Sequence, residues 1–267
     1  MPNKAQRNQK DRSVRPNCPP FLPIPCDANG VRLNTKGIDG RNCLQLSASP
    51  LEGMLASVAG GASQQHTHVE VIAVGDAVNV LYLKDRETTD GIDVFGTSFP
   101  NDHRRIVNQA VESACHDVRI PKSRGCGTDT RKLAPDWFNT DTQTSMNPVL
   151  HKSLTREALG QGIKIFEMVN QHGDGLTVYA APWQYAFSAK MYQHFSPRMT
   201  NYDLPNALVY LHEYIKITGN QKLKKGKVRG WVRDFGHLPN GARKDYMDAL
   251  LTTVRNAYFA KYETYPF

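Results

Sequence analysis

Many of the residues of this chain that could do chemistry lie in one short segment, residues 69–95, which reads VEVIAVGDAVNVLYLKDRETTDGIDVF. Its charged side chains include Arg86 and two carboxylates near a predicted strand, Asp90 and Asp93. Two carboxylates share a divalent metal ion most readily from positions i and i+2 of a strand, because both then point to one face. Asp90 and Asp93 are three positions apart, and Gly91 stands two positions before Asp93. We therefore expect a lone carboxylate, Asp93, and no metal site.

The elements that position this segment follow from its hydrophobic pattern. The apolar run at 69–74 predicts a buried strand that Gly75 ends, and 77–83 predicts a short helix. A second strand is predicted at 90–95, and a helix at 102–116, capped by its first residue. The apolar face of that helix is expected to consist of Ile106, Ala110, Val111 and Ala114.

The rest of the chain predicts two more strands and several helices. The strands are expected at 162–169 and 176–181, and a long loop is expected at 117–150. Start signals and apolar stripes predict helices at 51–60, 182–194, 203–217 and 242–260, with a glycine-rich loop at 219–236. We therefore predict an α/β (α+β) fold, in which a mixed sheet is followed by a helical carboxy-terminal half.

Three parts are predicted along the chain. Seven of the sixteen prolines lie in residues 1–50, where no hydrophobic period is sustained, so this part is expected to be an extended or poorly structured arm. Residues 51–181 are expected to form the α/β core. Residues 182–267 are expected to form a helical part packed on that core.

The composition argues against several classes of protein. No run approaches the roughly 18 apolar residues of a membrane helix, and the amino terminus has no apolar targeting region. We therefore expect a cytoplasmic protein without a membrane partner. Five cysteines without CxxC spacing predict reduced thiols rather than disulfides or a zinc site.

The net charge of +8 suits an anionic partner. The positive side chains form one cluster in the first fifteen residues and a second one at 222–233. Neither cluster lies in a motif that reads bases or phosphates. We interpret them as a solvated tail and a solvated loop, and we expect a small-molecule ligand rather than a nucleic acid.

Residues 69–95 resemble the nucleotidyltransferase superfamily, in its minimal branch of antitoxin-like and fungal uncharacterised proteins. Gly75 matches the first glycine of the family's turn, and Asp76 stands where a small residue is usual. The Asp-Ile-Asp strand of the family and its lead-in are matched by Arg86, Thr88, Thr89 and Gly91-Ile92-Asp93. Weaker matches follow at 135–139 and 176–190. The resemblance implies a nucleotidyltransferase-like sheet with a cleft at the turn.

The same resemblance implies a reaction that this chain is poorly equipped to perform. Nucleotidyl transfer places two divalent metal ions around a triphosphate, and this chain keeps only Asp93 of the carboxylate pair. Asp90 would replace the other carboxylate only through a bulge at Gly91, and Glu167 is a poor candidate for a third one. We therefore expect no cofactor, and Mg²⁺ only if nucleotide binding persists.

The resemblance and the residue types together give the candidate site. The candidate catalytic residues are Asp93, Asp76 and Lys190, the last at a position that points into the cleft in the family. The candidate substrate-binding residues are Gly75, Arg86, Thr88, Thr89, Trp137, Trp183 and Tyr185. Two histidines before the first strand, His66 and His68, could also reach the mouth of the cleft.

Structural roles are open for the same residues. Asp76 could cap a helix, Arg86 could pair with Asp90 or Asp93, and Lys190 could pair with Asp203. The three aromatic residues, Trp137, Trp183 and Tyr185, belong either to the core or to an apolar pocket.

Three functions follow as hypotheses. The first is a nucleotidyltransferase-fold protein with a broken metal site, which binds a small anionic or nucleotide-like ligand. The second is a repurposed fold that acts as a metal-independent cyclase or isomerase in natural-product biosynthesis, by a pericyclic step such as a Diels-Alder cycloaddition among others. The third is a non-enzymatic, antitoxin-like or RNA-contacting module. The sequence leaves the substrate and the oligomeric state open.

Overall fold

The computed structural model describes residues 46–96, 101–117, 137–140, 142, 146–194, 200–219, 221–235 and 244–267. The chain divides into two units, Met1–Cys43 and Leu44–Phe267, and the second unit contains all the described residues. The predicted arm therefore lies almost entirely outside them, although helix α1 (Ala48–Gln64) begins within its last residues. In the described part of the chain, no helix is long and apolar enough to cross a membrane.

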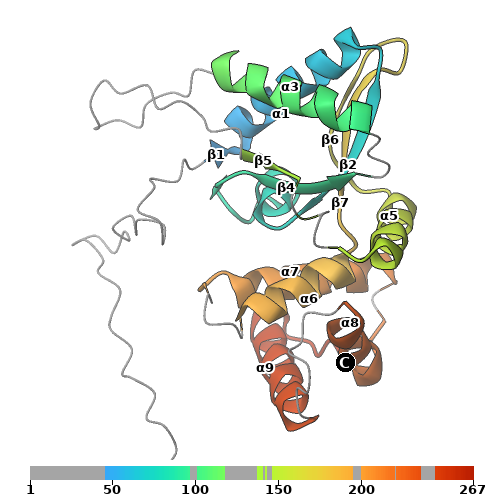
Figure 1. Cartoon of the computed structure of the whole chain (residues 1–267). Helices are drawn as coiled ribbons and strands as arrows, with labels where there is room; N and C mark the ends of the chain where they lie inside the picture. The colour runs from blue at the N-terminus through green and yellow to red at the C-terminus, as the bar shows by residue number, and fades with distance from the viewer. Residues whose placement is uncertain are drawn as a thin grey trace, which may run out of the picture. The chain divides into compact units, whose positions relative to one another are not determined.

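Five strands form a mixed sheet in the order β5-β4-β2-β7-β6 (Figure 1). Their bounds are β2 His68–Val74, β4 Ile92–Gly96, β5 Phe138–Asn139, β6 Lys164–Val169 and β7 Gly175–Ala180. The central strand β2 is antiparallel to β4 and parallel to β7, while β5 runs parallel to β4 and β6 antiparallel to β7. A separate pair joins β1 (Leu46–Ser47) to β3 (Thr88–Thr89). The mixed sheet and its four predicted strands, β2, β4, β6 and β7, are confirmed.

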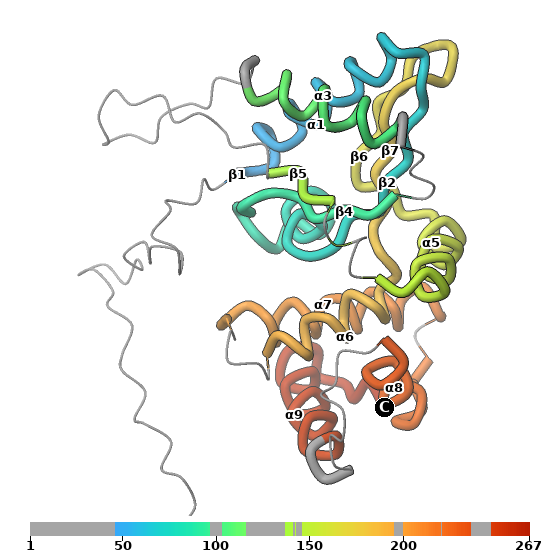
Figure 2. Tube along the Cα trace, viewed as in Figure 1, coloured from blue at the N-terminus to red at the C-terminus, as the bar shows by residue number. Residues whose placement is uncertain are grey.

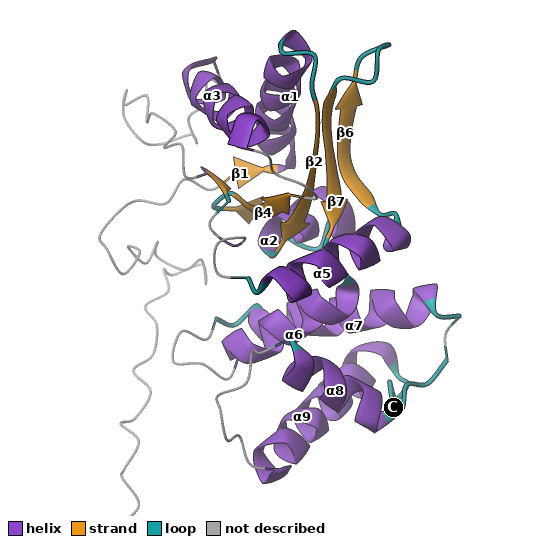
Figure 3. Cartoon of the chain, turned by 45° about the vertical axis from the view of Figure 1, so that its right-hand side comes forward, coloured by secondary structure: helices purple, strands orange, loops and turns teal. Residues whose placement is uncertain are grey.

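The two faces of the main sheet pack against different helices. The helices in this half are α1, α2 Asp76–Val78, the π-helical turn η1 Asn79–Leu83, α3 Asn101–Asp117 and α5 Pro148–Gln161. On one face Val71 and Val94 share a core with α1 and α3, which lie together in Figure 3. On the other face Ile72 and Phe95 pack against α5. Because both faces are covered, β2 reads as a nearly continuous apolar run.

Helix α1 extends beyond its predicted end. The sequence predicted a helix over 51–60 that stops at the following glycine-rich stretch, but the helix continues to Gln64. A Cβ atom on Gly61 would lie 2.7 Å from the Cβ atom of Ala110 in α3. Gly61 is therefore a point of close helix packing rather than a helix stop.

Helix α5 was not predicted from the sequence. Its first residues fall in the predicted long loop at 117–150, and no element was predicted for the rest of it. Its start follows a familiar pattern: the Asn147 side chain accepts a hydrogen bond of 2.8 Å from the Val149 amide, and Pro148 occupies the first helical position. Gly162, with φ of +68°, ends the helix. The Asn-Pro start and the glycine end were present in the sequence and could have identified this helix.

The carboxy-terminal part is helical, as predicted. Its helices are α6 Trp183–His194, α7 Asp203–Ile217, α8 Lys225–Asp234 and α9 Lys244–Tyr262. Figure 2 shows α6 and α7 between the sheet and the last two helices. The predicted loop at 219–236 is wrong, since α8 occupies most of it. Val228 and Val232, one turn apart, are buried and hold this helix in place despite its two glycines.

Most of the second basic cluster therefore lies on a helix, and only its residues 222–224 precede α8. Lys225 Nζ lies 3.0 Å from Asp248 Oδ1 of α9, and Arg229 pairs with the same carboxylate. Lys227 Nζ lies 5.0 Å from the centre of the Tyr214 ring. Part of the positive charge of this cluster is thus used within the fold.

Candidate functional site

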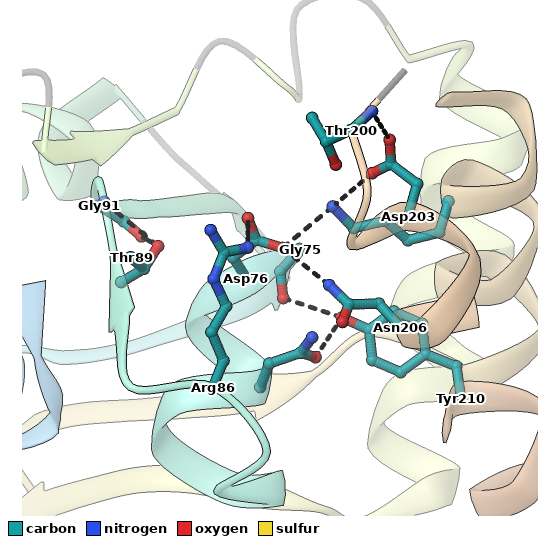
Figure 4. Close-up of polar contacts among 11 residues, drawn as sticks. Gly75, Asp76, Arg86, Thr89, Gly91, Thr200, Asp203, Asn206 and Tyr210 are labelled. Atoms are coloured by element: carbon teal, nitrogen blue, oxygen red, sulfur yellow. Dashed lines mark hydrogen bonds and ion pairs between the residues drawn. The ribbon is translucent and has the colours of Figure 1, made fainter. Parts of the chain in front are cut away.

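The turn that follows β2 is the centre of the candidate site (Figure 4). Gly75 has φ of +76°, a conformation that favours glycine. Asp76 is the first residue of α2, and Gly75 occupies the N-cap position before it. The predicted cap role of Asp76 is therefore wrong, and its carboxylate is used elsewhere.

The Asp76 carboxylate holds together three donors from different parts of the chain. Lys190 Nζ lies 3.0 Å from its Oδ1, and Asn206 Nδ2 donates to the same oxygen at 3.3 Å. Arg86 pairs with Oδ2. The ion-pair partner of Arg86 is thus Asp76, which the sequence analysis did not assign to it. Figure 4 shows Arg86 and Asn206 approaching the Asp76 carboxylate from different sides.

Lys190 connects α6 to its neighbours. It is only 8% exposed, and its Nζ also lies 3.5 Å from Asp203 Oδ1 at the start of α7. Asp203 is 1% exposed, and its other oxygen accepts a hydrogen bond of 2.6 Å from the Thr200 amide. The predicted Lys190–Asp203 pair is confirmed, and the contact of Lys190 with the turn adds Asp76 to it.

A buried tyrosine of α7, Tyr210, contacts the backbone of the turn. The Tyr210 hydroxyl lies 3.1 Å from the Gly75 carbonyl oxygen and 2.5 Å from Asn79 Oδ1, and its single proton serves one of these acceptors. Burial raises the pKa of Tyr210 well above its ordinary value, so the phenol stays protonated. Its ring stacks on Trp183, with centroids 5.8 Å apart. Tyr210 therefore fixes the backbone of the turn from α7.

Three of these polar residues were not predicted from the sequence: Asn79, Asn206 and Tyr210. A signal for two of them existed. In α7, Asp203, Asn206 and Tyr210 recur at a helical spacing and therefore lie on one face, among mostly apolar neighbours. A polar stripe of this kind on a buried helix indicates that it faces a polar partner.

Asp93 lies on β4 beside the turn. The parallel register of β4 and β5 places Asn139 opposite Asp93, and Asn139 Nδ2 donates to Asp93 Oδ1 at 2.8 Å. Asp93 Oδ2 lies 3.9 Å from the position that a Cβ atom on Gly75 would occupy. The Asp93 side chain reaches solvent, but the protein packed around it raises its pKa. The negative charge of Asp76 raises this pKa further. The hydrogen bond from Asn139 and the positive charge of Lys190 act in the opposite direction and lower it.

Gly91 is required by the packing of β5 against β4. A Cβ atom on Gly91 would lie 2.4 Å from the carbonyl oxygen of Trp137, which is a backbone atom. The Thr89 hydroxyl also donates a hydrogen bond of 2.8 Å to the Gly91 carbonyl oxygen, which holds the short connection between β3 and β4. The second carboxylate of the pair is therefore absent where the backbone leaves no room for one.

Several other predicted binding residues have structural roles. Thr89 is 4% exposed, and Thr88 and Thr89 form the strand β3. The aromatic candidates are buried, with Trp137 2%, Trp183 0% and Tyr185 7% exposed. Their burial fits the core interpretation and not a pocket lined by their rings.

The histidines lie away from the turn. His66 precedes β2 and His68 begins it, whereas Gly75 follows its last residue. His68 Nε2 lies 3.0 Å from Thr177 Oγ1. The expectation that these histidines reach the mouth of the cleft at the turn is therefore wrong.

The described residues contain no group of three or more histidine, cysteine, aspartate or glutamate side chains that could hold a metal ion. Glu167, the weak candidate for a third carboxylate, lies on β6 and pairs with Lys164. Both oxygens of Asp76 are occupied by Lys190, Asn206 and Arg86. Asp93 is thus the carboxylate at the turn that carries the fewest of these contacts.

No family model, curated protein or solved structure matches this chain.

Asp93→Asn is expected to make the protein more stable near neutral pH. Because the pKa of Asp93 is raised by folding, the native state binds more protons than the unfolded state above the ordinary carboxyl pKa of about 3.9. The stability contributed by this group therefore falls as the pH rises through the raised pKa. Urea denaturation should show a gain for the variant at pH 7 that shrinks as the pH approaches 4.

A matched control reverses the sign. Hydrogen bonding from Lys225 and the charge of Arg229 lower the pKa of Asp248. Asp248→Asn should therefore lose stability at pH 7, and this loss should shrink as the pH falls. If both variants change stability in the same direction at pH 7, the inferred environment of Asp93 is wrong.

Proposed function

We propose that this chain is a nucleotidyltransferase-fold protein with a broken metal site, which binds a small anionic, nucleotide-like ligand at the turn after β2. In this proposal the protein does not carry out ordinary two-metal nucleotidyl transfer. The ligand lies between the Gly75–Asp76 turn and Asp93 on one side and the start of α7 on the other. No metal ion or other cofactor is required to hold it.

The arrangement of the central elements supports this proposal. The strand β2, the turn at Gly75, the short helix α2 and the antiparallel strand β4 follow each other in the order that the resemblance of residues 69–95 implies. The strand β7 lies parallel on the other side of β2, and the next helix, α6, carries Lys190. The proposal of a nucleotidyltransferase-like fold rests on this order of elements together with the sequence resemblance.

The observation that carries the proposal is the convergence of charged residues at one turn. Four charged residues of the candidate site interact here although they come from different elements: Asp76 from α2, Arg86 from the segment before β3, Asp93 from β4 and Lys190 from α6. Arg86 is 24% exposed by its side chain and offers a cation that a ligand can reach. Clusters of this kind at the ends of neighbouring strands are common binding sites.

The same geometry argues against two-metal transfer. Mg²⁺ is usually held by one or two carboxylates together with substrate phosphates. Asp93 is one such group, but position 91 has no room for a second one, and the oxygens of Asp76 already accept from cations. The remaining attraction for a phosphorylated ligand comes from Arg86 and Lys190, which act without a metal ion.

Ligand binding by the intact chain tests this proposal. Calorimetry with ATP is expected to show binding that persists in EDTA, with a matching rise of the melting temperature. Arg86→Gln should weaken this binding about tenfold, the usual order of a lost charge-assisted hydrogen bond. Arg233→Gln is the matched control, because Arg233 pairs with its neighbour Asp234 on the exposed end of α8. Binding that requires Mg²⁺, or no binding at all, would contradict the proposal.

The environment of Asp93 favours a second candidate function, a metal-independent enzyme for a small organic substrate. A solvent-accessible carboxyl group whose pKa is raised and whose orientation is set by Asn139 suits general acid–base catalysis. This candidate corresponds to a repurposed cyclase or isomerase. Mass spectrometry of small-molecule extracts incubated with the wild-type chain and with Asp93→Asn would test it. A product that forms equally with both proteins would exclude Asp93 as its catalyst.

A further inference from the structure

The Asp76 carboxylate occupies a position where three donors meet. Lys190 Nζ at 3.0 Å, Asn206 Nδ2 at 3.3 Å and the Arg86 guanidinium all contact it (Figure 4). The donors come from α6, from α7 and from the segment between η1 and β3. A carboxylate that satisfies donors from three separate elements does what the anionic group of a ligand would do.

Asp76 is an ion-pair partner of both cations at this turn. Lys190 and Arg86 are opposed by Asp76 and Asp203. Without the Asp76 carboxylate, Arg86 would lose this ion pair and Lys190 would keep the one with Asp203, while Asp85 and Asp93 would act on the two cations only through longer-range charge. Lys190 is 8% exposed and Asn206 5% exposed, so water would replace the lost acceptor poorly.

One side of this arrangement is open to solvent. The Arg86 side chain is 24% exposed and the Asp76 side chain 27% exposed, whereas the Asp203 side chain is 2% exposed. The Arg86 guanidinium carbon lies 5.0 Å from the centre of the Tyr202 ring, and Tyr202 is 49% exposed. An anion can therefore approach Arg86 and Asp76 from solvent while the Lys190–Asp203 pair stays buried.

We propose that Lys190, Arg86 and Asn206 form a binding site for a phosphoryl group, and that Asp76 occupies this site as an internal counter-ion. A phosphoryl ligand displaces the Asp76 carboxylate from these donors and takes its place. A phosphoryl group has three free oxygens against two in a carboxylate, so it satisfies the same donors at least as well. This inference deepens the proposed function and rests on it for the location of the ligand.

Removal of the internal anion tests this inference. Asp76→Asn keeps the size of the side chain and removes its charge. Calorimetry with inorganic pyrophosphate, in EDTA, should show the variant binding about tenfold or more tightly than the wild-type chain, because the carboxylate charge that competes for the three donors is gone. The double variant Asp76→Asn/Arg86→Gln should lose most of this gain.

Asp248→Asn is the matched control for overall charge. Asp248 also bridges two cations, Lys225 and Arg229, and its loss changes the net charge of the chain by the same amount. Equal gains of pyrophosphate affinity in both variants would show non-specific attraction and overturn the inference. Unchanged or weaker binding by Asp76→Asn would overturn it as well.

The variant remains informative if it folds poorly. Loss of an anion that the fold needs should lower the melting temperature of Asp76→Asn, and saturating pyrophosphate should restore it. A variant that stays unfolded in pyrophosphate would contradict the inference.

The wild-type chain separates this inference from the proposed function. If the wild-type chain does not bind ATP but Asp76→Asn gains pyrophosphate binding, the internal counter-ion stands and the proposed function fails. If the wild-type chain binds ATP and Asp76→Asn gains nothing for pyrophosphate, the proposed function stands and the counter-ion is overturned.

Discussion

Lys190→Met is expected to lower the free energy of unfolding by about 3–5 kcal/mol, the usual cost of removing one partner from a buried ion pair. Methionine has a similar length, so packing is largely preserved. The loss leaves Asp203, which is 1% exposed, with an uncompensated charge, and it removes one of the cations that hold Asp76. Urea denaturation of the two proteins at neutral pH measures this difference.

Two further variants decide whether the cost comes from the unpaired charge. Lys216→Met removes a lysine from α7 whose side chain is 52% exposed and pairs with Glu213, so a change below about 0.5 kcal/mol is expected. Lys190→Met/Asp203→Asn should be more stable than Lys190→Met alone, because the buried charge is gone as well. A double variant that is less stable than the single one would show that the lysine acts through packing rather than charge.

Gly91→Asp is expected to destabilise the protein without creating a metal site. By strand parity, an aspartate at 91 would point to the same face as Asp93. The backbone of Trp137 lies too close: any Cβ atom at 91 would be 2.4 Å from its carbonyl oxygen. The strand β5 must move away from β4, at a cost of about 1–3 kcal/mol or more.

Denaturation and calorimetry with Mg²⁺ measure the two effects of Gly91→Asp separately. Gly91→Ala tests the steric part alone and should also be destabilising. Gly160→Ala is its matched control, because a Cβ atom on Gly160 meets nothing within 4 Å and alanine favours the helix α5 by about 0.5–1 kcal/mol. A stable Gly91→Asp variant that gains Mg²⁺ binding would show that β5 yields easily and that the carboxylate pair can be rebuilt.

Much of the fold could be predicted from local patterns. The strand β2, the glycine turn after it, the helix α3 and the helices α6, α7 and α9 all carry a period or an end signal in their own residues. The failures have specific causes. Helix α8 was predicted as a loop because Gly226 and Gly230 have low helix propensity, which two buried valines outweigh. Helix α1 passes through Gly61 because α3 packs closely there.

Most charged residues of the candidate site were predicted from the sequence, but most of the contacts between them were not. Asp76, Arg86, Asp93 and Lys190 were chosen from the sequence, and the Lys190–Asp203 pair was foreseen as their structural alternative. The role of Asp76 as the acceptor for Lys190, Arg86 and Asn206 was not foreseen. Asn206 is 130 positions away from Asp76, and no local spacing relates the two.

The sequence by itself determined which residue types stand at the turn and that position 91 carries no carboxylate. Strand parity and helix period are properties of neighbouring residues, so they can be read without the fold. Only the tertiary structure decided that the Trp137 backbone excludes a side chain at 91 and that the Asp76 charge is already neutralised. Both depend on β5, α6 and α7 being brought against the turn, and that approach is set by the packing of distant segments into one core.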